Sequence, residues 1–256
     1  MAVITLLTDF GTKDPYVGIM KGVILSIADD ATIIDISHEV GPQNTRECAF
    51  LVPEYYRYFE RGSVHVAVVD PMVGSSRRPV AVMKDGHVFV GPDNGIFSFL
   101  LTQPFETYAI QNSRFMLSNV SSTFHGRDIF APVAAHVAKG FHPSSLGDPV
   151  SDPVVLGDLR PIVREGVLWG EVIRFDHFGN AITNIGKETL EIFAGEKQIE
   201  ILLGDLVFSD LNEAYYERET SCLIGSNGYL EFALFRGSLQ HEYGLKKGEK
   251  IQVSRR

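Results

Sequence analysis

The chain has 256 residues, of which 45% are hydrophobic and 21% are charged, so it can bury one large core or two smaller ones, and a mostly disordered protein is excluded. Its formal net charge of -9 argues against nucleic-acid binding, because that function normally needs a basic stripe to neutralise phosphates. Only Cys48 and Cys222 are present, and their wide spacing predicts two reduced thiols rather than a disulfide or a zinc site.

The first residues predict no targeting signal. Residues 2–7 form an apolar run of strand length without a basic region before it, which is not the pattern of a signal peptide. No apolar stretch approaches the roughly 20 residues that a membrane helix requires. We therefore expect a cytoplasmic protein without a membrane partner.

The first half of the chain alternates strand-like and helix-like segments, which predicts an α/β layer structure with a mostly parallel sheet. A hairpin is expected around Asp85-Gly86, because this pair favours a tight turn. We expect strands at residues 3–7, 32–36, 63–69, 80–83 and 87–90, and helices at 16–28, 45–58, 95–101 and 126–139.

The pattern changes after about residue 145. Residues 151–165 contain prolines and glycines without a clear period, which is typical of a linker. The remaining residues are rich in short β runs separated by turns, which predicts a smaller β-barrel domain. We therefore expect an α/β domain at 1–150, a linker at 151–165 and a β-barrel domain at 166–256, with barrel strands at 167–175, 199–203, 221–224, 228–233 and 250–253.

Polar residues follow the predicted strands of the first domain, where open α/β sheets place their ligand sites. A carboxylate at Asp9 can accept two hydrogen bonds from a ribose diol, although an ordinary capped turn explains it equally well. Asp70 ends a buried strand and needs a cationic partner, which Arg77 can supply from the same loop; a common Asp-Pro turn with a solvated arginine is the alternative.

His125 stands directly before a predicted helix. The positive end of the helix dipole disfavours an imidazolium there, so this side chain is expected to be neutral and able to bond to a nucleophile. In the second domain, the carboxamide of Asn180 offers the paired donor and acceptor that an adenine edge requires. Ordinary hairpin turns are the alternative for residues 176–184 and 225–229.

Short motifs lie in the same order along nearly the whole chain. They are Thr8-Asp9-Phe10-Gly11, Asp14-Pro15-Tyr16-Val17-Gly18, Asp70-Pro71 with Gly74 and Arg77-Arg78, Gly91-Pro92-Asp93-Asn94-Gly95, Thr123-Phe124-His125-Gly126-Arg127-Asp128, Phe178-Gly179-Asn180 and Gly225-Ser226-Asn227-Gly228. Together they resemble the S-adenosylmethionine (SAM) hydroxide adenosyltransferase family, whose relatives include SAM-dependent chlorinases and fluorinases.

This resemblance implies hydrolysis of SAM to adenosine and methionine by a homotrimer with active sites between subunits, without a cofactor or a metal. In the hydrolase branch, residues at the positions of Asp70, Arg77 and His125 surround the nucleophilic water. The binding roles that it implies are Asp9 for the ribose hydroxyls, Asp14 and Asp176 for the methionine amino group, Asn180 for the adenine edge, Phe208 for adenine stacking, and Ser226 and Asn227 for the methionine end.

Two positions separate hydrolases from halogenases in this resemblance. Fluorinase-like members carry Tyr in place of Asp70 and a halide-binding Ser in place of Gly126. An anionic Asp70 would repel a halide by about 4 kcal/mol for unit charges about 4 Å apart at an effective dielectric constant near 20. The same carboxylate would accept a proton from water, so hydrolysis is favoured.

Three alternatives stay open at this point. The first is SAM-dependent halide transfer. The second is a metal-dependent phosphohydrolase, because Asp9, Asp14, Asp70 and His125 follow strands and oxygen ligands of this kind hold hard cations. The third is a sensor of SAM or adenosine that binds its ligand without turnover.

Overall fold

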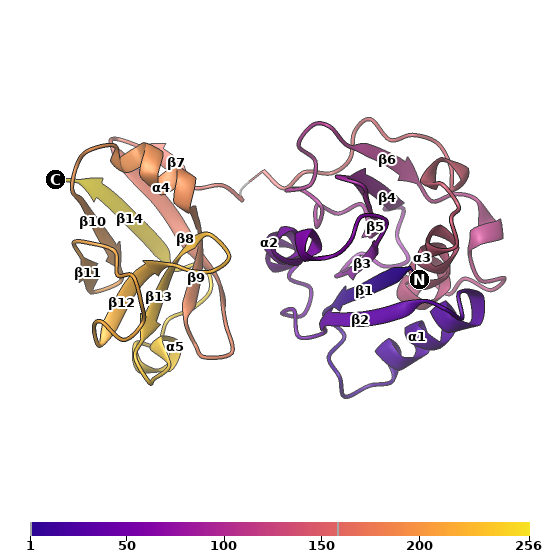
Figure 1. Ribbon diagram of the computed structural model, residues 1–256, viewed down its shortest axis with the longest axis horizontal. Coiled ribbons are helices and arrows are strands. Elements are labelled where there is room, and N and C mark those ends of the chain that lie inside the picture. Colours follow the sequence, from indigo (N-terminus) through magenta and orange to yellow (C-terminus); the bar gives the residue numbers. More distant parts are fainter. Residues whose placement is uncertain (1, 158) are drawn as a thin grey trace. The chain divides into compact units, whose positions relative to one another are not determined.

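The computed structural model describes residues 2–157 and 159–256, so Met1 of the expected first domain and Asp158 of the expected linker lie outside the described residues. The chain forms two compact units, Met1–Leu156 and Gly157–Arg256 (Figure 1). We call them unit 1 and unit 2 and describe each by itself.

Unit 1 contains a mixed sheet in the order β2-β1-β3-β5-β4-β6. The first four strands pair in parallel, while β4 pairs antiparallel with β5 and β6, so the predicted mostly parallel sheet is confirmed. At the turn between β4 and β5, Asp85 and Gly86 both have positive φ, 53° and 84°, as a tight hairpin requires. The strands are β1 (Val3–Thr8), β2 (Thr32–Ser37), β3 (Val64–Val68), β4 (Pro79–Lys84), β5 (His87–Pro92) and β6 (Glu106–Ala109).

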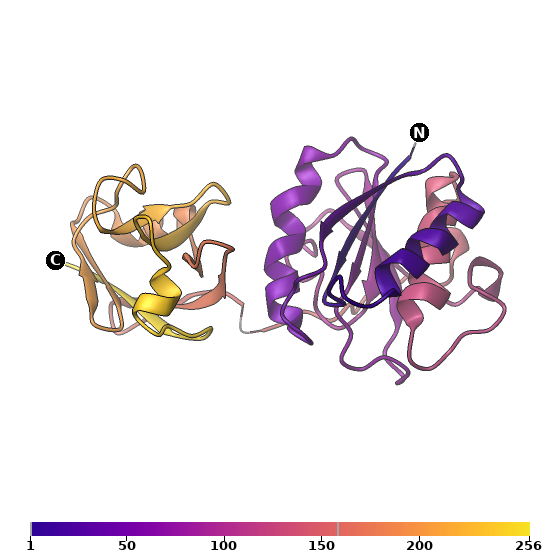
Figure 2. The same cartoon turned by 90° about the horizontal axis from the view of Figure 1, so that it is seen from below.

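Helices cover both faces of this sheet (Figure 2). The helices α1 (Tyr16–Ile27) and α3 (Ala131–Ala138) share one hydrophobic cluster with Val64, Val66 and Val68 of β3. Helix α2 (Thr45–Tyr55) shares the other cluster with Ala67 and Val69. Because successive side chains of a strand point to opposite faces, this alternation along one buried strand builds a three-layer α/β unit.

One predicted helix of unit 1 is wrong. Residues 96–100 form consecutive turns, with hydrogen bonds from Ser98 N to Gly95 O (3.0 Å) and from Leu100 N to Phe97 O (2.8 Å). Gly95 has φ of 95°, which starts this segment outside helical geometry. The predicted helix at 126–139 is present, but it begins with a π-helical turn at Gly126–Phe130 before α3.

The last residues of unit 1 are bound to the rest of the unit by hydrogen bonds. Arg78 donates to Asp93 Oδ2 (2.9 Å) and to Asp152 Oδ1 (2.8 Å), and Asp93 Oδ1 accepts from Val154 N (2.8 Å). Leu156 N adds a bond to Ser98 Oγ (2.9 Å). The first part of the expected linker is therefore packed structure in which the Asp93 motif takes part.

Unit 2 is the predicted barrel. Its antiparallel sheet follows the order β11-β10-β14-β8-β9-β13-β12, with β7 beside β8, and is nearly closed. The long strand β8 pairs with β14 along its first part and with β9 along its second, which lets the sheet curl around a core that includes Leu168, Phe232 and Ile251. The strands are β7 (Ile162–Arg164), β8 (Val167–Phe175), β9 (Ala181–Gly186), β10 (Ile199–Leu203), β11 (Leu206–Phe208), β12 (Thr220–Ile224), β13 (Tyr229–Leu234) and β14 (Lys250–Arg255), and the helices are α4 (Lys187–Ala194) and α5 (Leu239–Glu242).

Within residues 2–157 and 159–256, no helix combines the length and the apolar character that crossing a bilayer would need.

Unit 1 buries a histidine pair in its core. His65 is fully buried, with Nδ1 2.8 Å from Thr5 Oγ1 and Nε2 3.1 Å from His87 Nδ1, and its ring stacks on Phe89. Burial, helped by the nearby charge of His87, lowers the pKa of His65 to about 3. The ordinary histidine pKa in an unfolded chain is about 6.5, so between these values the unfolded state binds the extra proton.

We therefore predict that unit 1 loses stability as the pH falls below about 6.5, with a contribution from His65 of about 2 kcal/mol between pH 7 and pH 5. A His65→Asn variant should lose that much less over this interval, measured by native-state hydrogen exchange of the β3 amides. His177→Gln, on an exposed turn of unit 2, is the control and should keep the wild-type pH dependence. Equal pH dependence in wild type and His65→Asn would contradict the assignment.

Candidate active site

A cavity of about 670 Å³ lies at the carboxyl ends of β1 and β3, the edge at which parallel sheets place their ligand sites. Asp9 follows β1 directly, and Asp70 stands two residues after β3. The lining residues are Asp9, Phe10, Tyr16, Pro42, Gln43, Val68, Asp70, Pro71, Val73, Ser121, Thr123, Phe124, His125, Gly126 and Arg127.

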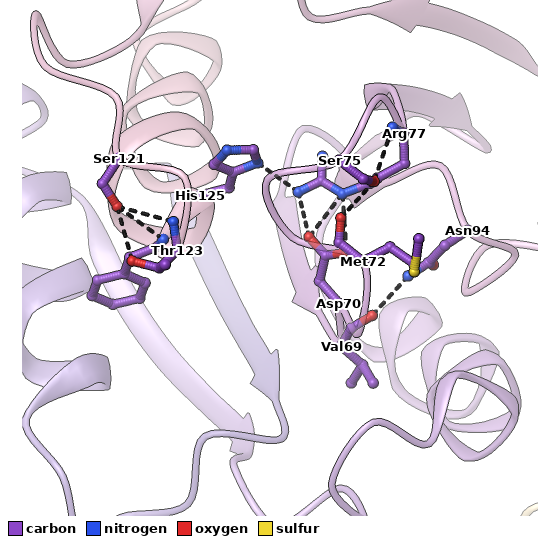
Figure 3. A network of polar contacts seen from close by, with 10 residues as sticks. Val69, Asp70, Met72, Ser75, Arg77, Asn94, Ser121, Thr123 and His125 are labelled. Carbon is purple, nitrogen blue, oxygen red and sulfur yellow. Dashed lines mark hydrogen bonds and ion pairs between the residues drawn. The ribbon is translucent and has the colours of Figure 1, made fainter.

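Asp70 and Arg77 form the predicted ion pair (Figure 3). Nε of Arg77 donates to Oδ1 (3.0 Å) and Oδ2 (2.8 Å) of Asp70, and Nη2 also donates to Oδ2. Both side chains are buried, with 8% of Arg77 and 5% of Asp70 exposed. A buried charge of either sign is costly unless it is paired, so the pairing offsets part of the cost of burying both side chains.

The same guanidinium, which does not line the cavity, also contacts His125, which does. Nη2 of Arg77 lies 2.7 Å from His125 Nδ1 (Figure 3). An arginine N–H can only donate, so Nδ1 accepts and the neutral imidazole carries its proton on Nε2. Burial first, and then the charge of Arg77, lower the pKa of His125, which keeps the ring neutral at pH 7. Sequence analysis predicted this neutral state from the helix dipole, whereas the structure attributes it to burial and Arg77.

Two loops must approach closely for this contact to form. Gly74 has φ of 80°, and a Cβ added there would lie 2.2 Å from the carbonyl oxygen of Ser122, so only glycine fits between the two loops. Buried Asp128 holds the second loop by accepting from Ser121 N (2.8 Å) and from Arg127 Nε (2.6 Å). The family motifs around Gly74 and Asp128 therefore bring Arg77 to His125.

The strand end that carries Asp70 is also fixed. Nδ2 of Asn94 donates to the carbonyl oxygen of Val69 (2.8 Å; Figure 3). Ser75 Oγ donates to Met72 O (2.7 Å) and so stiffens the loop between Asp70 and Arg77.

Asp9 is the second carboxylate of the cavity. Its Oδ2 accepts from Gln43 N (2.7 Å), which leaves Oδ1 for other partners. Burial raises the pKa of Asp9, the charge of Asp70 adds to this effect, and the backbone bond from Gln43 opposes it. Asp14 is not brought to this wall: it is exposed, precedes α1 and is absent from the cavity lining.

Sequence analysis missed an aromatic wall of the cavity. Tyr16 and Phe124 meet edge to face with ring centres 5.2 Å apart, and Phe10 lies 6.0 Å from Tyr16 and 5.8 Å from Phe124. All three line the cavity. The rings belong to motifs that the sequence pattern singled out, but periodicity alone does not tell a cavity ring from a core ring.

In unit 2, Asp176 and Asn180 hold one hairpin turn. Asp176 Oδ1 accepts from Asn180 N (2.9 Å), and Asp176 Oδ2 accepts from Asn180 Nδ2 (3.1 Å). Buried Glu231 lies beside this turn and accepts from Tyr215 Oη (2.9 Å). Its burial raises its pKa, Asp176 adds to this effect, and a bond from Asn180 opposes it. A Cβ at Gly225 would lie 2.3 Å from Glu231 Oε2, so Glu231 joins the two turns that sequence analysis selected.

The other predicted residues of unit 2 have different surroundings. Ser226 is exposed and Asn227 is half-buried on the turn between β12 and β13, where Asn227 Oδ1 accepts from Tyr229 N (3.2 Å). Phe208 is only 4% exposed and lies 5.3 Å from the Phe232 ring in the barrel core. The contact that the structure shows for Phe208 is therefore core packing, and adenine stacking by this ring stays a prediction.

Among residues 2–157 and 159–256, no group of three or more His, Cys, Asp or Glu side chains is placed to hold a metal ion.

The fold and this cavity define a two-unit protein with a buried Asp–Arg–His contact at the end of a parallel sheet. Residues 4–147 match the model of the SAM hydroxide adenosyltransferase N-terminal domain, and residues 170–252 match that of its C-terminal domain. The chain belongs to the SAM hydroxide adenosyltransferase family.

Three similar proteins illustrate this membership. The (R)-S-adenosyl-L-methionine hydrolase of Thermus thermophilus is 36% identical over 265 residues, covering 99% of this chain and 100% of that protein. A fluorinase of Actinoplanes sp. is 28% identical over 291 residues, covering 99% of this chain and 97% of the fluorinase. The crystal structure of an uncharacterized conserved protein from Thermotoga maritima has a TM-score of 0.88 and 34% identity, covering 98% of this chain and 100% of that one.

The Arg77 contact makes a prediction about His125. In an Arg77→Met variant, the pKa of His125 should rise, because the positive charge beside it is gone while Asp70 and Asp128 still favour the imidazolium. Titration of the imidazole by NMR measures this shift. Arg78→Met removes a neighbouring arginine that pairs with Asp93 instead, and should leave the His125 pKa unchanged. An unchanged pKa in Arg77→Met would contradict the proposed contact.

Proposed function

We propose that this protein hydrolyses SAM to adenosine and methionine, with the (R) epimer as substrate, by direct attack of water on C5′ of the ribose. The observation that carries the proposal is that Asp70 and neutral His125 both line one cavity, while Arg77 holds them together from behind. The name of the similar Thermus thermophilus hydrolase supports both the reaction and the epimer.

The reaction needs little chemistry from the protein. A water oxygen forms the new bond to C5′ while the C5′–S bond breaks, and the electron pair leaves with sulfur as the neutral thioether of methionine. Because a thioether departs without a proton, no general acid is required. The protein then contributes mainly by holding water in line with the sulfonium and by excluding bulk solvent.

The proton of the attacking water goes to Asp70 in this proposal. The Nε2 atom of His125 already carries a hydrogen, because its Nδ1 accepts from Arg77. His125 therefore donates to the water and orients it rather than taking its proton. The carboxylate of Asp70 keeps lone pairs besides those that Arg77 occupies and is the remaining acceptor within the Asp70–Arg77–His125 contact.

The other site roles follow from the family resemblance and the cavity. Oδ1 of Asp9 would hold the ribose hydroxyls, and the aromatic wall would face the cationic sulfonium, which rings attract. We propose a cytoplasmic homotrimer with active sites between subunits. Asp14, which precedes α1, and Asp176 of unit 2 would bind the methionine amino group. The other residues of unit 2 would be Asn180 for the adenine edge, Phe208 for adenine stacking, and Ser226 and Asn227 for the methionine end.

The residues of the cavity allow one alternative, halide transfer, to be weighed against hydrolysis. Arg77 offsets the charge of Asp70, which weakens electrostatic repulsion of a halide as an argument for water. Gly126 supplies a steric argument instead. A Cβ at this position would lie 3.3 Å from ring atoms of Phe10 and from the sulfur of Met20, so a halide-binding serine would require these side chains to shift by a few tenths of an ångström.

The direct experiment is to incubate the purified protein with (R)-SAM in H₂¹⁸O with EDTA and without halide, and to analyse the products by mass spectrometry. We expect adenosine that carries one ¹⁸O and free methionine. Asp70→Asn should lower kcat by about 100-fold or more, the usual range for a lost general base. Asp30→Asn, an exposed residue after α1, is the matched control and should keep wild-type kcat.

Each other outcome identifies a rival. A 5′-chlorinated nucleoside formed only with added chloride would replace hydrolysis by halide transfer. Activity lost in EDTA and restored by a divalent cation would favour a metal-dependent hydrolase. Tight SAM binding without any product would leave a sensor. Full activity of Asp70→Asn would contradict the proposed proton acceptor.

A further inference from the structure

Behind Asp9 lies a second buried polar contact that the catalytic proposal does not use. Thr8, the last residue of β1, is fully buried, and its Oγ1 lies 2.8 Å from Nδ1 of His38. His38 follows β2 directly and is 5% exposed. Neither residue lines the cavity.

The contact continues to the surface through charged groups. Nε2 of His38 lies 3.1 Å from Asp35 Oδ1, and Lys21 Nζ lies 2.5 Å from Asp35 Oδ2. Although partial burial acts the other way, the bond from Lys21 and the nearby His38 ring hold the pKa of Asp35 below its usual range. The ionised Asp35 therefore favours a proton on Nε2 of His38, which leaves Nδ1 to accept from the hydroxyl of Thr8.

The same two residues accept hydrogen bonds from the backbone that follows Asp9. Thr8 Oγ1 accepts from Phe10 N (3.2 Å), and the carbonyl oxygen of His38 accepts from Gly11 N (2.7 Å). The loop that begins at His38 then supplies Gln43 N, which donates to the Asp9 carboxylate (2.7 Å). Because the Thr8 hydroxyl donates to His38 while accepting from Phe10, it has one orientation, and so has the segment that carries Asp9.

We propose that Thr8 and His38 are positioning residues that aim the carboxylate of Asp9 at a vicinal diol of the ligand, and so set the selectivity for ribonucleosides. The inference rests on the proposed function, in which Asp9 holds the ribose hydroxyls. Thr8 and His38 act through Asp9 and touch neither the ligand nor the reacting atoms.

The test compares the affinity of the full-length protein for adenosine and for 2′,3′-dideoxyadenosine, which lacks both hydroxyls, by isothermal titration calorimetry. Wild type should prefer adenosine by about tenfold or more, since hydrogen bonds to a charged group contribute on this order. Thr8→Val keeps the side-chain shape but removes the hydroxyl, and should lower this ratio by about fivefold or more. Thr8→Ser keeps the hydroxyl and should retain the wild-type ratio.

A second pair of variants tests His38. His38→Asn can place an acceptor oxygen near the position of Nδ1 and should retain more of the preference than His38→Leu. Melting temperatures of all variants report any loss of stability. A purely structural role would lower the affinity for both nucleosides by the same factor and would leave their ratio unchanged. An unchanged ratio in Thr8→Val, with wild type selective, would overturn the inference alone. A wild type that does not distinguish the two nucleosides would overturn the proposed role of Asp9 as well.

Discussion

The candidate site depends on the contacts of one buried guanidinium, that of Arg77, which bonds to Asp70 on one side and to His125 on the other. It spans a loop that follows β3 and a loop that precedes α3, so their backbones must approach as closely as Gly74 allows. A buried arginine is tolerated only with partners that accept its hydrogens. Because Arg77 can only donate, His125 accepts at Nδ1 and is a neutral imidazole that carries its proton on Nε2.

The two carboxylates of the cavity are held by the same physical means. Asp70 is held by Arg77 and by the strand end that Asn94 fixes, and Asp9 is held by Gln43 and the contact between Thr8 and His38. In each case a polar network buried behind the cavity sets the direction of a carboxylate that lines it. Such support limits motion of the side chain before a ligand arrives, which is how a site gains from preorganisation.

Local patterns in the sequence predicted the parts of this structure that local forces determine. Asp85-Gly86 marked a hairpin because its turn needs two positive φ angles, and Asp70 required a cation because it ends a buried strand. The contact between Arg77 and His125 joins residues 48 positions apart, and that between Thr5 and His65 joins residues 60 apart, so local patterns do not reveal them. The family resemblance placed Arg77 and His125 around one water, but their direct contact is seen only in the packed fold. The helix expected at 95–101 failed because the positive φ of Gly95 and the hydrogen bond from Leu156 N to Ser98 Oγ override a short apolar pattern. Glu231 gave no signal, since a lone acid on a strand is usually solvated.

Whether Asp70 or His125 takes the water proton depends on which nitrogen of His125 is protonated, and ¹⁵N NMR of the histidine-labelled protein at pH 7 reports this most directly. With Arg77 donating to Nδ1, the spectrum should show a neutral ring with a bare Nδ1 and a protonated Nε2. That result would leave Asp70 as the acceptor of the water proton. A ring protonated on Nδ1, or an imidazolium at this pH, would contradict the contact and reopen His125 as the base.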